Sequence, residues 1–162
     1  MKRYPLATLI RLREHRTQAA QQLVLQHQRE VAAKRAACME IERHIDALGE
    51  ERARQRRQLL DPPPAGIAWP MALAQREAHI ELLQQQTELA HQQLLRAQQL
   101  LTEAEAELQK VREAFFRIKA REDALKKRKD LWREEQHANE LRQEELASAE
   151  LLHRRTTPNA FH

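Results

Sequence analysis

The feature that most constrains the fold of this chain is a seven-residue repeat of apolar residues in two long segments. Within each segment the apolar residues alternate at spacings of three and four, which places them along one side of an α-helix. Heptads sustained over this length are typical of a left-handed coiled coil, in which a narrow apolar seam joins two helices. The repeat therefore predicts an all-α fold built from two long helices.

The repeat assigns sixteen seam positions to each segment, and thirteen of the sixteen are apolar in the second segment against ten in the first. The predicted seam of the first segment consists of Leu6, Ile10, Arg13, Thr17, Ala20, Val24, His27, Val31, Lys34, Cys38, Ile41, Ile45, Leu48, Arg52, Gln55 and Leu59. That of the second segment consists of Leu73, Arg76, Ile80, Leu83, Thr87, Ala90, Leu94, Ala97, Leu101, Ala104, Leu108, Val111, Phe115, Ile118, Glu122 and Leu125.

Composition supports a narrow seam rather than a wide core. Charged residues make up 32% of the chain and aromatic residues only 4%, so too few large apolar side chains are present to fill a globular interior. The abundant Gln, Ala, Leu, Glu and Arg are strong helix formers. The single cysteine, Cys38, excludes an internal disulfide framework and fits a reducing cytosol.

The stretch DPPPAGIAWP, residues 61–70, separates the two heptad segments. Proline within a helix costs about 3 kcal/mol or more, so no helix continues through this stretch. Proline is well tolerated in the first turn of a helix, a position that Pro70 can take. We predict a single coiled-coil hairpin over residues 1–162, with a helix at about 5–60, a loop at 61–70, a helix at about 71–155 and a tail at 156–162.

An antiparallel arrangement across this loop predicts a specific register. With Leu59 opposite Leu73, the numbers of facing residues sum to 131 or 132, which places Val24 opposite Leu108 and Leu6 opposite Leu125. The heptad pattern slips after Leu125 and resumes at Leu131. About 30 residues of the second helix, from about 126 to 155, are therefore expected to lack a partner within the chain.

Charge is concentrated at the end of the hairpin that carries both termini. Residues 1–16 hold five basic groups and one acidic group, and residues 117–129 hold seven basic groups and two acidic groups. In the predicted register these stretches lie side by side, although the net charge of the whole chain is only +4. Arg13 falls opposite Ile118, one layer from Glu122, so that carboxylate is a candidate structural partner for it.

The sequence carries no motif for catalysis, nucleotide binding or metal coordination. The glycines stand alone at positions 49 and 66, so no glycine-rich phosphate loop is present. The eight histidines include no pair at the i, i+4 spacing. No apolar run approaches the roughly 20 residues of a membrane span. We therefore expect a protein that is not an enzyme, holds no cofactor and does not insert into the membrane.

Two stretches resemble the FliJ/YscO family, the central stalk proteins of flagellar and virulence type III export ATPases. The segment YPLATLIRLRE at 4–14, followed by QAAQQL at 18–23, is similar to the N-terminus of that family, and AGIAW at 65–69 is similar to its hairpin region. The resemblance implies a two-helix antiparallel coiled coil similar to the shaft of rotary ATPases. It also implies a cytoplasmic protein peripheral to the inner-membrane secretion apparatus.

The family further implies that the terminal end enters a hexameric ATPase, that the loop end reaches the cytoplasmic part of the export gate, and that some members handle chaperones of exported proteins. Charge and the resemblance together predict a basic collar around two leucines as the ring contact: Leu9, Leu12, Arg11, Arg13, Arg16, Arg117, Lys119, Arg121, Lys126, Lys127, Arg128 and Lys129. The predicted export-gate contact consists of Trp69, Met71 and Leu73.

Two other functional classes are compatible with the sequence. A homo-oligomeric structural coiled coil would pair the overhanging helix with a second copy, so that its helicity and mass would depend on concentration. A helical arm that binds nucleic acid through Lys126–Lys129 would lose affinity steeply with salt. The family resemblance favours a protein partner over nucleic acid.

Overall fold

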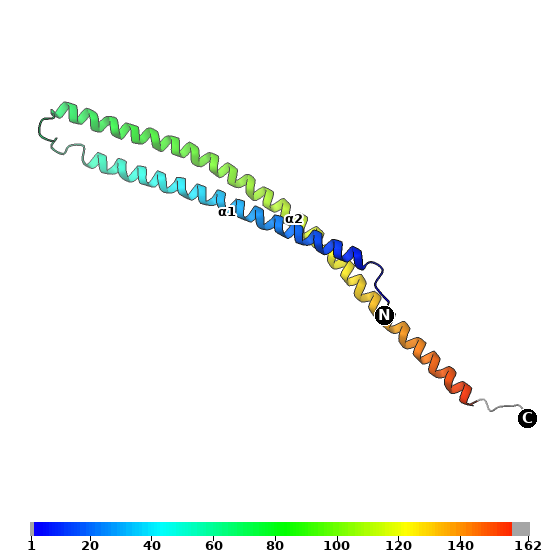
Figure 1. The fold of residues 1–162 in the computed structure, drawn as a ribbon. Coiled ribbons are helices and arrows are strands. Elements are labelled where there is room, and N and C mark those ends of the chain that lie inside the picture. The colour runs from blue at the N-terminus through cyan, green and yellow to red at the C-terminus, as the bar shows by residue number, and fades with distance from the viewer. Residues whose placement is uncertain (1, 157–162) are drawn as a thin grey trace, which may run out of the picture. The chain divides into compact units, whose positions relative to one another are not determined.

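The computed structural model describes residues 2–156, which form two α-helices and contain no strand. Helix α1 spans Ala7–Arg57, helix α2 spans Trp69–Thr156, and residues 58–68 join them (Figure 1). The predicted all-α antiparallel hairpin, with the second helix longer than the first, is confirmed. The observed helix ends differ from the predicted ones by at most three residues. The predicted tail at 156–162 lies, apart from Thr156, outside the described residues.

The contacts between the helices divide the chain into two compact units. The loop unit consists of residues 23–112, and the terminal unit contains the described residues 2–22 and 113–156. Each unit is a pair of antiparallel helical segments, one from α1 and one from α2. The prediction of a single domain over residues 1–162 stays a prediction.

The predicted seam is the buried stripe of both helices. All of the predicted seam positions except Lys34 are buried or half-buried. In the loop unit the buried apolar residues are Val31, Cys38, Leu48, Ala72, Leu83, Ala90 and Leu108. Leu48, Leu83 and Ala90 form a cluster against which Ile45 packs. Lys34 is exposed because its long side chain can carry the ammonium group out of the seam to water.

The loop reverses the chain through a turn that requires glycine. The Ile67 amide donates to the Pro64 carbonyl at 3.2 Å, and Gly66, the third residue of this turn, has a φ of 89°. A positive φ at that position is the mark of a type II turn, and glycine adopts it without a steric penalty. Pro70 lies in the first turn of α2, as predicted, where its missing amide proton removes no helical hydrogen bond.

In the terminal unit the seam continues beyond its predicted end. Ile10, Thr17 and Glu122 are buried there, and half-buried residues follow Leu125 on α2 at the same spacing of three and four: Lys129, Trp132 and Gln136. The rings of Tyr4 and Trp132 pack with centroids 5.4 Å apart. The predicted slip of the heptad after Leu125 is therefore wrong, because the polar Lys129 and Gln136 occupy seam positions that an apolar pattern overlooks.

The part of α2 without a partner is shorter than predicted. Every residue from 137 to 156 is exposed, whereas the sequence predicted an unpaired stretch from about residue 126. The N-terminal segment accounts for the difference, since Tyr4 reaches Trp132 and Glu14 pairs with Lys126 at 3.4 Å. The exposed stretch still carries large apolar side chains at Leu141, Leu146, Leu151 and Leu152.

Two contacts between the helices lie seven residues from the predicted register, although Leu48 and Leu83, which the prediction pairs, still belong to one cluster. In the loop unit Leu108 lines one groove with Val31 instead of Val24, and Arg35 pairs with Glu105 at 3.2 Å. In the terminal unit Glu122 lies beside Thr17, seven residues beyond the predicted neighbour Ile10. A shift of seven residues keeps the same face of each helix in the seam, so apolar spacing cannot distinguish the two registers.

A buried carboxylate occupies the seam of the terminal unit. Glu122 is 4% exposed, and the ammonium groups of Lys126 and Lys119 lie 2.8 Å and 3.6 Å from its oxygens. Hydrogen bonds from Lys126 and then from Thr17 hold the pKa of the Glu122 carboxyl below its ordinary value of 4.5, while burial acts in the opposite direction. Burial has the smaller effect because a two-helix seam surrounds the carboxylate with only a thin layer of protein.

The register can be tested with cysteine pairs in a Cys38→Ala background. Val31→Cys combined with Leu108→Cys should form a disulfide within the monomer, because these side chains line one groove. Val24→Cys combined with Leu108→Cys is the matched control, since it crosslinks efficiently only in the register predicted from sequence. The measurement is the fraction of monomer oxidised, by non-reducing mass spectrometry. Preferential oxidation of the control pair would contradict the observed register.

The stability of the terminal unit should depend on the charge of Glu122. We expect Glu122→Gln to lower the free energy of unfolding at pH 7 by about 1 kcal/mol, since it removes a charged hydrogen-bond acceptor. A lowered folded-state pKa stabilises the fold above pH 4.5, and that contribution disappears as the pH falls through the folded-state pKa. The stabilities of wild type and variant should therefore converge as the pH falls below 4.5 in urea titrations. Glu145→Gln, at an exposed position, serves as the control. Parallel curves for wild type and Glu122→Gln would show that the carboxylate does not contribute.

Candidate protein-interaction surfaces

Six of the predicted ring-contact cations form an exposed set in the terminal unit. Among residues 2–156, no ion pair forms with any member of this set: Arg11, Arg16, Arg117, Arg121, Lys127 and Arg128. Exposed cations without internal partners attract negatively charged partners through a field that salt screens. We call this set the open cations.

Two other predicted collar residues are engaged within the fold. Lys119 pairs with Asp123 at 3.3 Å as well as with Glu122, and Lys126 bridges Glu122 and Glu14. The pKa of Lys126 is raised, chiefly by its hydrogen bond to the Glu122 carboxylate. These two lysines therefore stabilise the helix pair, and their charge is partly neutralised before any partner arrives.

Arg13 does not take the structural role that the sequence offered it. The Glu122 carboxylate is bound by the two lysines, and Arg13 has no ion pair among the described residues. Its Nε atom is buried without a hydrogen-bond partner in the described part of the chain. Lys119 and Lys126 lie on the neighbouring turns of the helix that carries Glu122, and they occupy its carboxylate in place of Arg13.

The two leucines predicted at the centre of the collar differ in exposure. Leu12 is 44% exposed, whereas Leu9 is half-buried. Leu9 directly precedes the seam residue Ile10, and Leu12 follows it by two positions. Seam residues recur every three or four positions, so neither leucine belongs to the buried stripe. Leu12 thus presents an apolar side chain within the same helical turns as the open cations Arg11 and Arg16.

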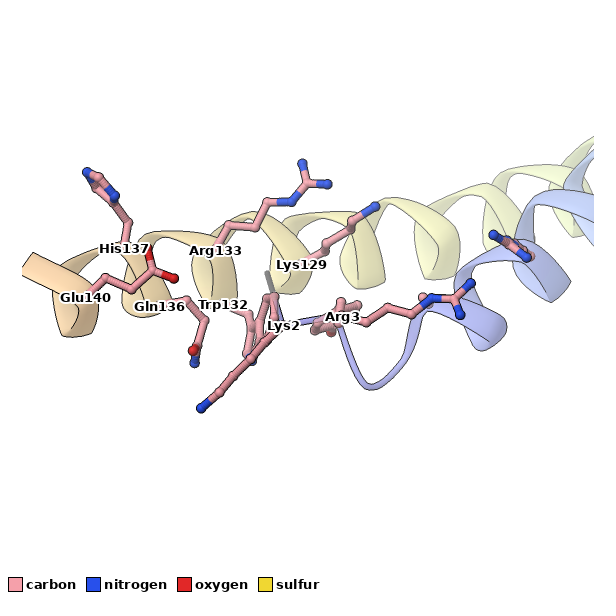
Figure 2. Close-up of a pocket in the computed structure, with 11 residues that line it drawn as sticks. Lys2, Arg3, Lys129, Trp132, Arg133, Gln136, His137 and Glu140 are labelled. Atoms are coloured by element: carbon pink, nitrogen blue, oxygen red, sulfur yellow. The ribbon is translucent and has the colours of Figure 1, made fainter.

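The terminal unit also contains a hollow that was not predicted from sequence, although Trp132, which lines it, continues the three-four spacing from Lys129. The hollow has a volume of about 580 Å³. Figure 2 shows Trp132 extending from α2 towards the segment that carries Lys2 and Arg3. Tyr4 packs against the indole ring with an interplanar angle of 58°. Basic side chains from both segments line the hollow, and two of them, Arg11 and Lys129, are predicted collar residues.

The predicted export-gate contact lies in the loop unit, where apolar residues are exposed. Trp69 is 46% exposed and Met71 60%, whereas Leu73 is half-buried. The structure adds two residues that the prediction omitted, Leu60 and Ile67, both exposed. Exposed aromatic and methionine side chains are typical of protein-interaction surfaces. We call Leu60, Ile67, Trp69 and Met71 the loop patch.

Arg76 fixes the backbone beside the loop patch. Its Nη1 atom lies within hydrogen-bond distance of the carbonyl oxygens of Gln58, Leu59 and Asp61, at 3.1, 2.9 and 2.7 Å. These carbonyl groups belong to the first residues after α1, so this guanidinium group holds the backbone in place where the loop begins. An arginine at a seam position therefore positions the loop that carries the patch.

The described residues hold no group of three or more side chains that could bind a metal ion. Neither α1 nor α2, within residues 2–156, contains a stretch apolar and long enough to span a membrane. The features that the structure does present are exposed cations, exposed apolar side chains and an open hollow, which are suited to binding other proteins.

Comparisons with known proteins agree with this architecture. No curated protein matches the chain. The solved structure of a proposed YscO homolog, CT670 from Chlamydia trachomatis, superposes with a TM-score of 0.74 at 21% sequence identity. The alignment covers 97% of this chain and 100% of that protein, and at this identity it supports the fold. The model of the YscO-like protein family matches residues 1–156. The chain therefore belongs to the YscO-like family, whose members are associated with type III secretion.

Proposed function

We propose that this protein is the non-enzymatic central stalk of a type III secretion ATPase, located in the cytoplasm beside the inner-membrane apparatus. Its terminal unit engages the hexameric ATPase ring, and its loop patch contacts the cytoplasmic domain of the export gate. Secretion chaperones are a further class of partner. Membership of the YscO-like family supports the link to secretion. The stalk role and its partners are the proposal.

The observation that carries the ring contact is the exposed Leu12 beside the open cations Arg11 and Arg16 on a paired helix. An apolar side chain removed from water on binding contributes affinity, roughly 25 cal/mol for each Å² of buried apolar surface. The surrounding cations speed encounter with an acidic surface more than they add affinity. Because the seam residues already hold the helix pair together, these side chains are free to serve a partner.

The same geometry supports the proposal of a non-enzymatic role. A two-helix pair buries one stripe of each helix and encloses no site that could exclude water from a reaction. In the proposed role the ATPase carries out the chemistry, and this protein alters its rate by binding. The loop patch makes a second contact, in which Trp69, Met71 and their neighbours bind the export gate.

Leucine and charge variants should affect ring binding in different ways. Leu9→Ala with Leu12→Ala should weaken binding about tenfold or more, mainly by faster dissociation, with little change in helicity. Reversal of Arg11, Arg16 and Arg117 to glutamate should mainly slow association, and the difference from wild type should shrink at high salt, where the steering of the wild-type protein is screened. Surface plasmon resonance against the ATPase and ATPase stimulation assays measure both effects.

The matched control for charge is the reversal of Arg29, Arg96 and Arg112 to glutamate, which changes the same charge on exposed positions of the loop unit. This control variant should associate with the ring at a rate closer to that of wild type than the terminal-unit charge variant does. If the terminal-unit variants bind and stimulate like wild type while Trp69→Ala with Met71→Ala abolishes stimulation, the two contacts are assigned the wrong way round. Helicity that rises with protein concentration, without ATPase binding, would instead favour the homo-oligomeric alternative.

A further inference from the structure

The hollow of the terminal unit combines an aromatic surface with unpaired positive charge. Tyr4 and Trp132 are half-buried and pack with ring centroids 5.4 Å apart. Five basic residues line the same hollow of about 580 Å³: Lys2, Arg3, Arg11, Lys129 and Arg133. Within residues 2–156 none of these five forms an ion pair. The size falls within the range of about 300–1,000 Å³ that is typical of ligand sites.

The charge of the hollow selects carboxylate ligands. Glu140 is the only acidic residue of the described chain that lines it, against the five cations. Arginine binds carboxylates through two parallel hydrogen bonds, and Arg3 and Arg133 come from different segments, so two separate carboxylates can be held. Figure 2 shows Trp132 and Lys2 on one side of the α2 ribbon and the Arg133 side chain on the other, so carboxylates held by Lys2 and Arg133 would lie on either side of the helix.

The aromatic pair selects a ligand that is apolar between its charges. Half-buried rings offer apolar surface to an aliphatic or aromatic side chain, and such contacts are enriched at protein interfaces. A nucleic acid fits less well, because its backbone needs a continuous basic track. The adjacent turns of α2 instead carry Asp130, Glu134 and Glu135, all exposed.

We propose that this hollow binds a short acidic segment of a partner protein, whose carboxylates pair with Lys2, Arg3, Lys129 and Arg133 and whose apolar side chain packs on Tyr4 and Trp132. The inference rests on the proposed function only for the identity of the partner, which would be a protein that meets the terminal end. The chemistry of the hollow can be tested on the isolated protein.

Intrinsic fluorescence provides a local signal, because the chain contains two tryptophans and Trp69→Phe leaves Trp132 as the only one. The probe is a peptide of alternating glutamate and leucine, added to the full-length Trp69→Phe protein. We expect a saturable change in Trp132 emission and at least a tenfold weaker affinity when glutamine replaces glutamate. Replacing leucine with serine in the peptide should also weaken binding.

Variants of the rim locate the site. Arg3→Glu with Arg133→Glu changes two exposed residues of the hollow, so folding should persist by circular dichroism while peptide affinity falls at least tenfold. Arg117→Glu with Arg128→Glu is the matched control, since it changes the same charge in the terminal unit on residues that do not line the hollow. Equal losses from both variants would mean that net charge, and not this hollow, binds the peptide.

Other outcomes overturn the proposal in different ways. Equal affinity for the glutamate and glutamine peptides would show that carboxylates are not selected. Tighter binding of a single-stranded oligonucleotide than of the acidic peptide would assign the hollow to nucleic acid. Peptide binding without any ATPase binding would refute the stalk proposal and leave the hollow supported. Binding to the ATPase ring with no detectable peptide binding would refute the proposal for the hollow and leave the stalk proposal supported.

Discussion

The structure depends on one constraint, which is that a pair of helices can bury only a single stripe of each. No residue of the core is completely buried in the described chain, and the most enclosed core residue, Ala90, is still 2% exposed. Stability therefore accumulates along the length of the seam through many small contributions instead of from one compact core. The same constraint leaves every other face of both helices in water, available for contact with partners.

Within such a seam a polar group has a large effect on register. Lys119 and Lys126 lie on the same helix as Glu122 and accompany it in any register, whereas Thr17 comes from α1 and lies beside Glu122 only in the observed register. A one-heptad shift would move the carboxylate away from Thr17 and leave a buried acceptor with fewer hydrogen bonds, which costs free energy. A polar residue at a seam position commonly specifies register in coiled coils. The groove shared by Val31 and Leu108 in the loop unit shows the same alignment.

The two candidate surfaces could be predicted from sequence to different extents. Trp69 and Met71 stood out because a proline-rich loop flanks them, and both are exposed. The basic collar was predicted as one set of charges, yet Lys119 and Lys126 bind carboxylates of the helix pair while Arg11 and Arg16 stay open. The hollow at Trp132 was missed, because charge counting does not show which segment lies beside an aromatic residue of a helix believed to be unpaired.

The sequence by itself determined the two helices, the loop between them and the stripe that each helix buries. These features depend on local propensity, on proline and on apolar spacing, all of which are properties of residues near one another in the chain. Only the tertiary structure decided the register, the pairing of Tyr4 with Trp132 and the division of the cations into paired and open ones. The physical reason is that a heptad pattern repeats after seven residues, so several alignments bury the same stripes. The choice among them comes from contacts such as that of Glu122 with Thr17, between residues far apart in the chain.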